Sequence, residues 1–152
     1  MLQATCLRAA RPADGDAVDS LVIGLSHFHS FWRYAVLIAA VVAFVGALAG
    51  WLGSLPARPT ARRASLLYII AIDLQAALGI VLWLLRGGFG QERPYRLEHP
   101  LIMILAVVAI HVGSVLAKRA KSDKAAARIV AIAIAVSFVL VLVGIPGLLP
   151  GR

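Results

Sequence analysis

The chain has 152 residues, of which 61% are hydrophobic and only 14% are charged. A water-soluble domain of this size cannot bury so large an apolar share, so the composition indicates a protein whose solvent is lipid. The formal net charge is +8, but the basic residues cluster beside the apolar stretches instead of forming a stripe on a soluble face, which argues against nucleic-acid binding. The lone cysteine, Cys6, excludes a disulfide framework within the chain.

Residues 1–25 are polar and rich in alanine, and they lack the apolar core of a secretory signal. We expect a disordered N-terminal tail there, followed by a single four-helix transmembrane domain over residues 26–152.

Four apolar stretches follow, at about residues 31–52, 66–85, 101–117 and 129–149. Each approaches or exceeds the length that crosses about 30 Å of hydrocarbon at about 1.5 Å per residue. Backbone groups in lipid must be hydrogen-bonded within their own segment, so stretches rich in alanine and leucine should be helices. The sequence therefore predicts an all-α integral membrane four-helix bundle with up-down-up-down topology, surrounded by a lipid bilayer.

The connections between these stretches predict the orientation. "GSLPARPTARRAS" and "KRAKSDKAAAR" together hold eight basic residues, against Arg33, Arg86, Arg93 and Arg96 at the opposite end of the bundle. The positive-inside rule then places both basic hairpins in the cytoplasm. We expect a multi-pass protein of the bacterial inner (cytoplasmic) membrane with both termini outside.

Two histidines open the first and third stretches, in "SHFHSFWRY" and "LEHP". The helices that carry His29 and His99 run in the same direction, so the two imidazoles should lie at similar depth near the outer surface. Two neutral imidazoles facing each other in a bundle are what the axial positions of a haem iron require. His27 lies about 200° around the helix from His29, so at most one of them points inward, and we favour His29. The alternative is that these histidines are interfacial and solvated.

Arg33 lies one turn after His29, inside the apolar stretch, and needs an anionic partner there. A haem propionate, Glu98 and a lipid phosphate would each serve. A second polar group, Asp73 with Gln75 and His111, should lie deeper, towards the cytoplasmic side. We expect Asp73 and His111 to pair in the bundle interior, where they could orient a ligand for a metal or haem, relay a proton, bind a quinone or only lock two helices together.

The motifs "HSFWRY", "DLQAALG", "EHPLIMILAVVAIHVG" and "VGIPG" resemble a family of small four-helix bacterial membrane proteins labelled cytochrome b-like, over about His29 to Pro146. The resemblance rests on His29, Ser30, Arg33, Leu74, Gln75, Gly79, Glu98, His99, Pro100, His111 and Gly113. It departs at Tyr34, where the family is expected to carry Trp, and at Asp73, where it often carries His. Because aspartate is a poor haem ligand, the second departure favours either His29 and His99 as the ligands or a protein that binds no haem.

The resemblance implies haem b and electron transfer, with electrons exchanged with quinone or a larger respiratory or photosynthetic membrane complex. The candidate haem-binding residues are His29, His99, Arg33 and His111. No phosphate loop, metalloprotease histidine pair or activated nucleophile is present, so an electron carrier or accessory subunit is favoured over a stand-alone enzyme. The alternatives are a non-catalytic accessory subunit of a membrane complex and a small proton-coupled transporter.

Overall fold

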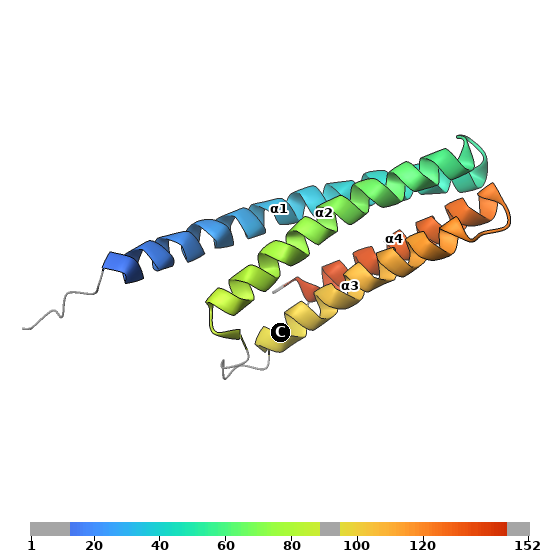
Figure 1. Cartoon of the computed structure of the whole chain (residues 1–152). Coiled ribbons are helices and arrows are strands. Elements are labelled where there is room, and N and C mark those ends of the chain that lie inside the picture. The colour runs from blue at the N-terminus through green and yellow to red at the C-terminus, as the bar shows by residue number, and fades with distance from the viewer. Residues whose placement is uncertain (1–12, 89–94, 146–152) are drawn as a thin grey trace, which may run out of the picture.

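Four long helices make up nearly all of the described part of the chain, residues 13–88 and 95–145, in the computed structural model (Figure 1). The helices are α1 (Ala13–Leu52), α2 (Ala57–Leu85), α3 (Tyr95–Lys118) and α4 (Asp123–Gly144). Each of them is long and apolar enough to cross a membrane. The prediction of an all-α, membrane-spanning four-helix bundle is therefore confirmed.

The bundle consists of two helical hairpins, α1 with α2 and α3 with α4, which lie against each other as two layers (Figure 1). The helices alternate in direction, as the up-down-up-down topology requires. Helix α4 also contacts α1 and α2, whereas α2 and α3 are the loosest of the packed pairs. The bundle therefore has a less tightly closed seam between α2 and α3.

The two ends of the bundle differ in chemistry. We call the end that holds His29 and His99 the histidine end, and the end with the short α1–α2 and α3–α4 turns the basic end. Helix α1 has 40 residues, which at about 1.5 Å per residue is roughly 60 Å, twice the thickness of the hydrocarbon core. In Figure 1 its N-terminal part projects beyond the other helices at the histidine end.

All four helices begin well before their predicted first residues, because polar residues extend each helix beyond its apolar stretch. Helix α1 begins at Ala13, so the expected disordered tail is wrong from residue 13 onward, and residues 1–12 lie outside the described part. Helix α2 begins at Ala57 instead of residue 66, and α3 begins at Tyr95 instead of residue 101. Pro100 consequently lies inside α3, in its second turn.

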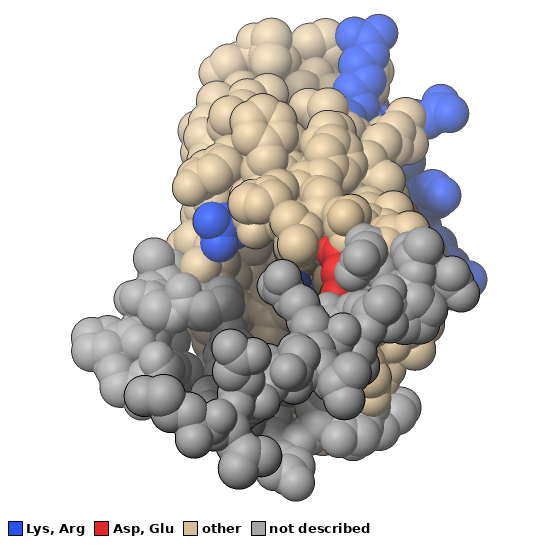
Figure 2. Space-filling view, turned by 90° about the vertical axis from the view of Figure 1, so that its left-hand side faces the viewer, with Lys and Arg blue, Asp and Glu red and all other residues tan. Residues whose placement is uncertain are grey.

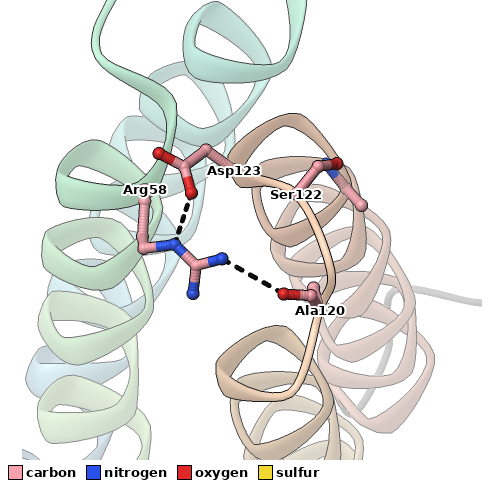
Figure 3. Close-up of polar contacts among 5 residues, drawn as sticks. Arg58, Ala120, Ser122 and Asp123 are labelled. Carbon is pink, nitrogen blue, oxygen red and sulfur yellow. Dashed lines mark hydrogen bonds and ion pairs between the residues drawn. The ribbon is translucent and has the colours of Figure 1, made fainter.

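The basic end is tied together by short-range polar contacts. Helix α4 begins at Asp123 instead of residue 129, after Ser122, whose hydroxyl accepts a hydrogen bond of 3.1 Å from the Ala125 amide. This is an ordinary N-cap. Arg58 of α2 forms an ion pair of 2.5 Å with Asp123 and donates to the Ala120 carbonyl at 3.1 Å (Figure 3). The Arg58 side chain therefore joins the two hairpins.

The core of the bundle is built largely from alanine, which lets the helices approach closely. Thirteen of the buried core residues are alanines, at positions 39, 40, 43, 47, 61, 64, 71, 106, 117, 126, 127, 131 and 133. Large apolar side chains lie instead on the outer faces, among them Ile38, Ile70, Val112 and Ile132. The described surface in Figure 2 is accordingly mostly uncharged, with basic side chains gathered chiefly along one side. Such an exterior is suited to lipid.

One series of hydrogen bonds crosses this apolar core. The Tyr68 hydroxyl lies 3.0 Å from the Ser137 hydroxyl, which in turn donates to the Ala106 carbonyl at 2.7 Å. Tyr68 and Ser137 are both fully buried. Because the Ser137 hydroxyl donates its proton to the carbonyl, the Tyr68 hydroxyl is the donor to Ser137. These two hydrogen bonds link α2, α4 and α3.

Candidate functional site

A cavity of about 320 Å³ lies at the histidine end, between side chains of all four helices. This volume is in the range of about 300–1,000 Å³ that ligand pockets occupy. Most of its polar lining comes from His29 and Arg33 of α1, Gln75 of α2, Arg86 after α2, and His99 of α3. The remaining walls are mostly apolar. The cavity therefore combines an apolar volume with a few converging polar and basic groups.

The structure brings His29 and His99 together across this cavity. Their ring centroids lie 6.4 Å apart, and the rings are inclined by 78°. They come from α1 and α3, which are not among the closely packed helix pairs. His27, two residues before His29, is exposed and does not line the cavity.

Gln75 holds His29 in place. Its amide nitrogen lies 3.1 Å from His29 Nε2 and donates to the His29 backbone carbonyl, also at 3.1 Å. Since an amide nitrogen only donates, His29 Nε2 is the acceptor, and the proton of the neutral ring is on Nδ1. Among the described residues, His29 Nδ1 and Gln75 Oε1 are buried and have no hydrogen-bond partner.

Gly79 makes room for the His29 ring. A Cβ atom at this position would lie 3.1 Å from His29 Cε1 and 3.7 Å from its Nδ1. Any larger side chain would therefore displace the imidazole. This glycine accommodates a side chain that faces the cavity.

His99 is held in place by a hydrogen bond from its Nδ1 atom. Its Nδ1 donates a hydrogen bond of 2.7 Å to the backbone carbonyl of Gly144, at the end of α4. The neutral ring then has an unprotonated Nε2. A histidine held in this way by a carbonyl is the usual arrangement of a metal-binding imidazole, because the hydrogen bond fixes both tautomer and orientation.

Two arginines add positive charge to the cavity. Arg33 lies with its guanidinium carbon 5.2 Å from the centroid of the Tyr34 ring, and no ion pair joins it to Glu98. Arg86 donates a hydrogen bond of 2.6 Å to the Ser26 hydroxyl. The sequence predicts Arg86 at this end of the bundle but does not identify it as a cavity residue, because its position after the second apolar stretch does not define which way it faces.

Asp73 and His111 form a separate pair outside the cavity. Asp73 Oδ2 lies 3.4 Å from His111 Nε2, so the two side chains meet as the sequence suggests. The expected interior placement is wrong, because the side chains are 45% and 47% exposed on the outer surface between α2 and α3. Grouping Gln75 with them is also wrong, since Gln75 points to His29.

Gly113, one of the residues on which the family resemblance rests, packs against α4. A Cβ atom on Gly113 would overlap the Cβ of Ala133, so this glycine allows close contact between α3 and α4. In the described residues no group of three or more His, Cys, Asp or Glu side chains is placed to hold a metal ion. A metal at the histidine end would therefore need ligands beyond the two imidazoles.

Comparisons with protein-family models, with curated proteins and with solved structures found no match to this chain. The likeness to the cytochrome b-like family remains a prediction. The chain is, on its fold, a four-helix protein with helices suited to spanning a membrane and a histidine-lined cavity at one end.

Proposed function

We propose that the chain is a haem-b-binding membrane protein that transfers electrons, and that the cavity at the histidine end is its haem site. The observation that carries this proposal is the pairing of His29 and His99. Two imidazole nitrogens at about 2.0 Å from a shared metal ion would place the ring centroids roughly 6 Å apart. The 6.4 Å between these two rings agrees with that spacing.

Two histidine ligands suit a six-coordinate porphyrin iron better than a metal ion without a porphyrin. The porphyrin itself supplies four nitrogens, so two protein ligands are sufficient. His99 offers Nε2 without any change. His29 offers Nε2 once the Gln75 amide releases it, and that amide can keep its second hydrogen bond, to the His29 carbonyl. Ligation by His29 therefore requires one local hydrogen bond to be exchanged.

The basic residues of the cavity match the carboxylates of a haem. Arg33 and Arg86 line the cavity at the histidine end, where their charge would stabilise propionate groups. A partly buried arginine in a membrane span is otherwise costly, so an anionic ligand would also stabilise the protein. The apolar walls, among them Ile72 and Met103, would exclude water from the site.

A bound haem would supply one-electron chemistry within the membrane, and the chain's own residues would position it. His29 and His99 hold the ligating nitrogens, Gln75 and the Gly144 carbonyl orient the rings, and the arginines bind the carboxylates. The electron partner would be a quinone or a larger respiratory or photosynthetic complex in the same bilayer. The basic end would face the cytoplasm of a bacterial inner membrane, with both termini outside.

A second candidate is a non-catalytic accessory subunit. One observation favours it: both histidines already make hydrogen bonds that join helices, His29 to Gln75 of α2 and His99 to the last residue of α4. In that role the same contacts serve only to fix helix packing. The two functions differ in whether haem is bound.

The test is the haem content of protein purified after expression with a haem precursor. We expect equimolar haem in the wild type. Gly79→Ala should lower haem affinity by roughly 10-fold to 100-fold, the usual effect of disturbing a group that supports a metal ligand. Gly46→Ala is the matched control, because its Cβ would meet only the Thr60 methyl at 3.7 Å. Wild-type protein without haem would contradict the proposal and favour the accessory subunit.

A further inference from the structure

The pair of Asp73 and His111 lies where an ionisable pair is least stable. Asp73 lies within the candidate membrane span of α2 and His111 within that of α3, and both side chains are nearly half exposed. The surrounding exposed residues, Ile70 and Leu74 on α2 and Val112 on α3, are apolar. In a bilayer this pair would face acyl chains, which is unfavourable for carboxylate and imidazole groups.

The pair retains unused hydrogen-bonding capacity. His111 Nδ1 donates to the Val107 carbonyl at 3.0 Å, whereas its Nε2 lies 3.4 Å from Asp73 Oδ2 in an ion-pair contact without a hydrogen bond. His111 Nε2 and the Asp73 carboxylate therefore remain open to a hydrogen-bond partner from outside the bundle. A protonated His111 donates from Nε2 and the carboxylate accepts, so the patch then offers a donor and an acceptor side by side.

In the described part of the chain, residues 21–52 of α1 and 124–144 of α4 contain no acidic side chain that could form such a pair. Exposed residues on these two helices, such as Val45 and Ile132, are apolar. Helices α2 and α3 are also the loosest packed neighbours of the bundle. The one polar patch in the middle of the described spans therefore coincides with the most open seam.

We propose that a second copy of this chain covers the face around Asp73 and His111, forming a two-fold dimer whose axis is parallel to the membrane normal. A two-fold interface brings the same patch of both copies together. An axis along the normal keeps both pairs at the same depth, so Asp73 of each copy would meet His111 of the other. The patch is complementary to itself, since one member accepts and the other donates. This proposal does not depend on the haem proposal.

Cysteine crosslinking in membranes tests which face is covered. In a Cys6→Ser background, Leu74→Cys and Val112→Cys place thiols beside the pair. Ile132→Cys on α4 is the matched control, because Ile132 is 52% exposed and Val112 is 51% exposed. We expect disulfide-linked dimers at one or both positions beside the pair, at roughly tenfold the yield of the control or more, as adjacency raises the effective concentration. Equal yields, or no dimer beside the pair, would overturn the proposal.

Single-molecule photobleaching of the labelled full chain in dilute vesicles tests whether the polar pair drives the contact. Wild type and Asp73→Asn should bleach mainly in two steps, because the amide still donates and accepts. Asp73→Leu should bleach mainly in one step while keeping its helical circular dichroism. Single-step bleaching of the wild type would mean that lipid or another protein covers the face. Unchanged two-step bleaching of folded Asp73→Leu would equally exclude this pair as the contact.

Discussion

Single side chains set the internal order of this bundle through a few buried hydrogen bonds. The hydroxyl chain from Tyr68 through Ser137 to the Ala106 carbonyl is the deepest of them. In this chain the Ser137 hydroxyl both accepts and donates, whereas the Tyr68 hydroxyl only donates. The two hydroxyl groups should therefore contribute unequally to stability.

We predict that Ser137→Ala destabilises the protein more than Tyr68→Phe. Ser137→Ala leaves the buried Tyr68 hydroxyl without a partner, at a cost of about 1–3 kcal/mol, whereas Tyr68→Phe removes one hydrogen bond worth about 0.5–1.5 kcal/mol. The free energy of unfolding, measured in detergent with increasing denaturant, compares the two variants. A larger loss for Tyr68→Phe would show that the donor assignment is reversed.

The polar residues of α2 show what the sequence predicts about single side chains and what it does not. Asp73 and Gln75 are two residues apart, which places them about 200° apart around a helix. The sequence identified both as functional candidates, but it grouped them by depth. The structure separates them by face: Gln75 points into the cavity and Asp73 points outward. Which face is interior depends on how the four helices pack, which the spacing within one helix does not define.

Helices are held together by small residues at close contacts. Gly113 of α3 lies against Ala133 of α4, and the core contains alanine on all four helices. This is the packing expected where lipid, not water, surrounds the bundle and helices associate by close van der Waals contact.

We predict that Gly113→Ala destabilises the bundle by about 1–3 kcal/mol, because the added methyl group overlaps Ala133. Adding Ala133→Gly to this variant should restore much of the loss, since the methyl group then changes only its helix. Gly24→Ala is the control, as no atom lies within 4 Å of its added Cβ. Unfolding in detergent measures all variants. A double variant no more stable than Gly113→Ala would argue against this contact.

The sequence predicts the last residues of α1 and α2 correctly but not the first residues of the helices. The ends of α1 and α2, at Leu52 and Leu85, match the sequence prediction, because glycine follows them within two residues. The starts were predicted too late, since the prediction followed hydrophobicity alone. Arginine and lysine are good helix formers in water, so α2 and α4 continue past the apolar region where no lipid is required.

At the scale of the whole molecule, the two hairpins create two chemically distinct ends. The basic end is joined by Arg58 and Asp123, and the histidine end holds the cavity. The asymmetry of basic residues sets the orientation that we expect in a membrane.

We predict that the basic end faces the cytoplasm. In a Cys6→Ser background, a membrane-impermeant thiol reagent should label Gln91→Cys in intact cells and Arg63→Cys only after the cells are opened. Arg63 is exposed at the basic end, so poor access to the reagent would not explain a negative result. Labelling of Arg63→Cys alone in intact cells would reverse the orientation.

The most direct test of the central claim is the reduced-minus-oxidised absorption spectrum of purified wild type, His29→Ala, His99→Ala and His111→Ala. Ligation by the two cavity histidines predicts a low-spin haem-b signal in the wild type. The signal should be lost or converted to high spin in His29→Ala and His99→Ala, and retained in His111→Ala, because His111 lies outside the cavity. Loss of the signal in His111→Ala alone would contradict the assignment of the haem site to the histidine end.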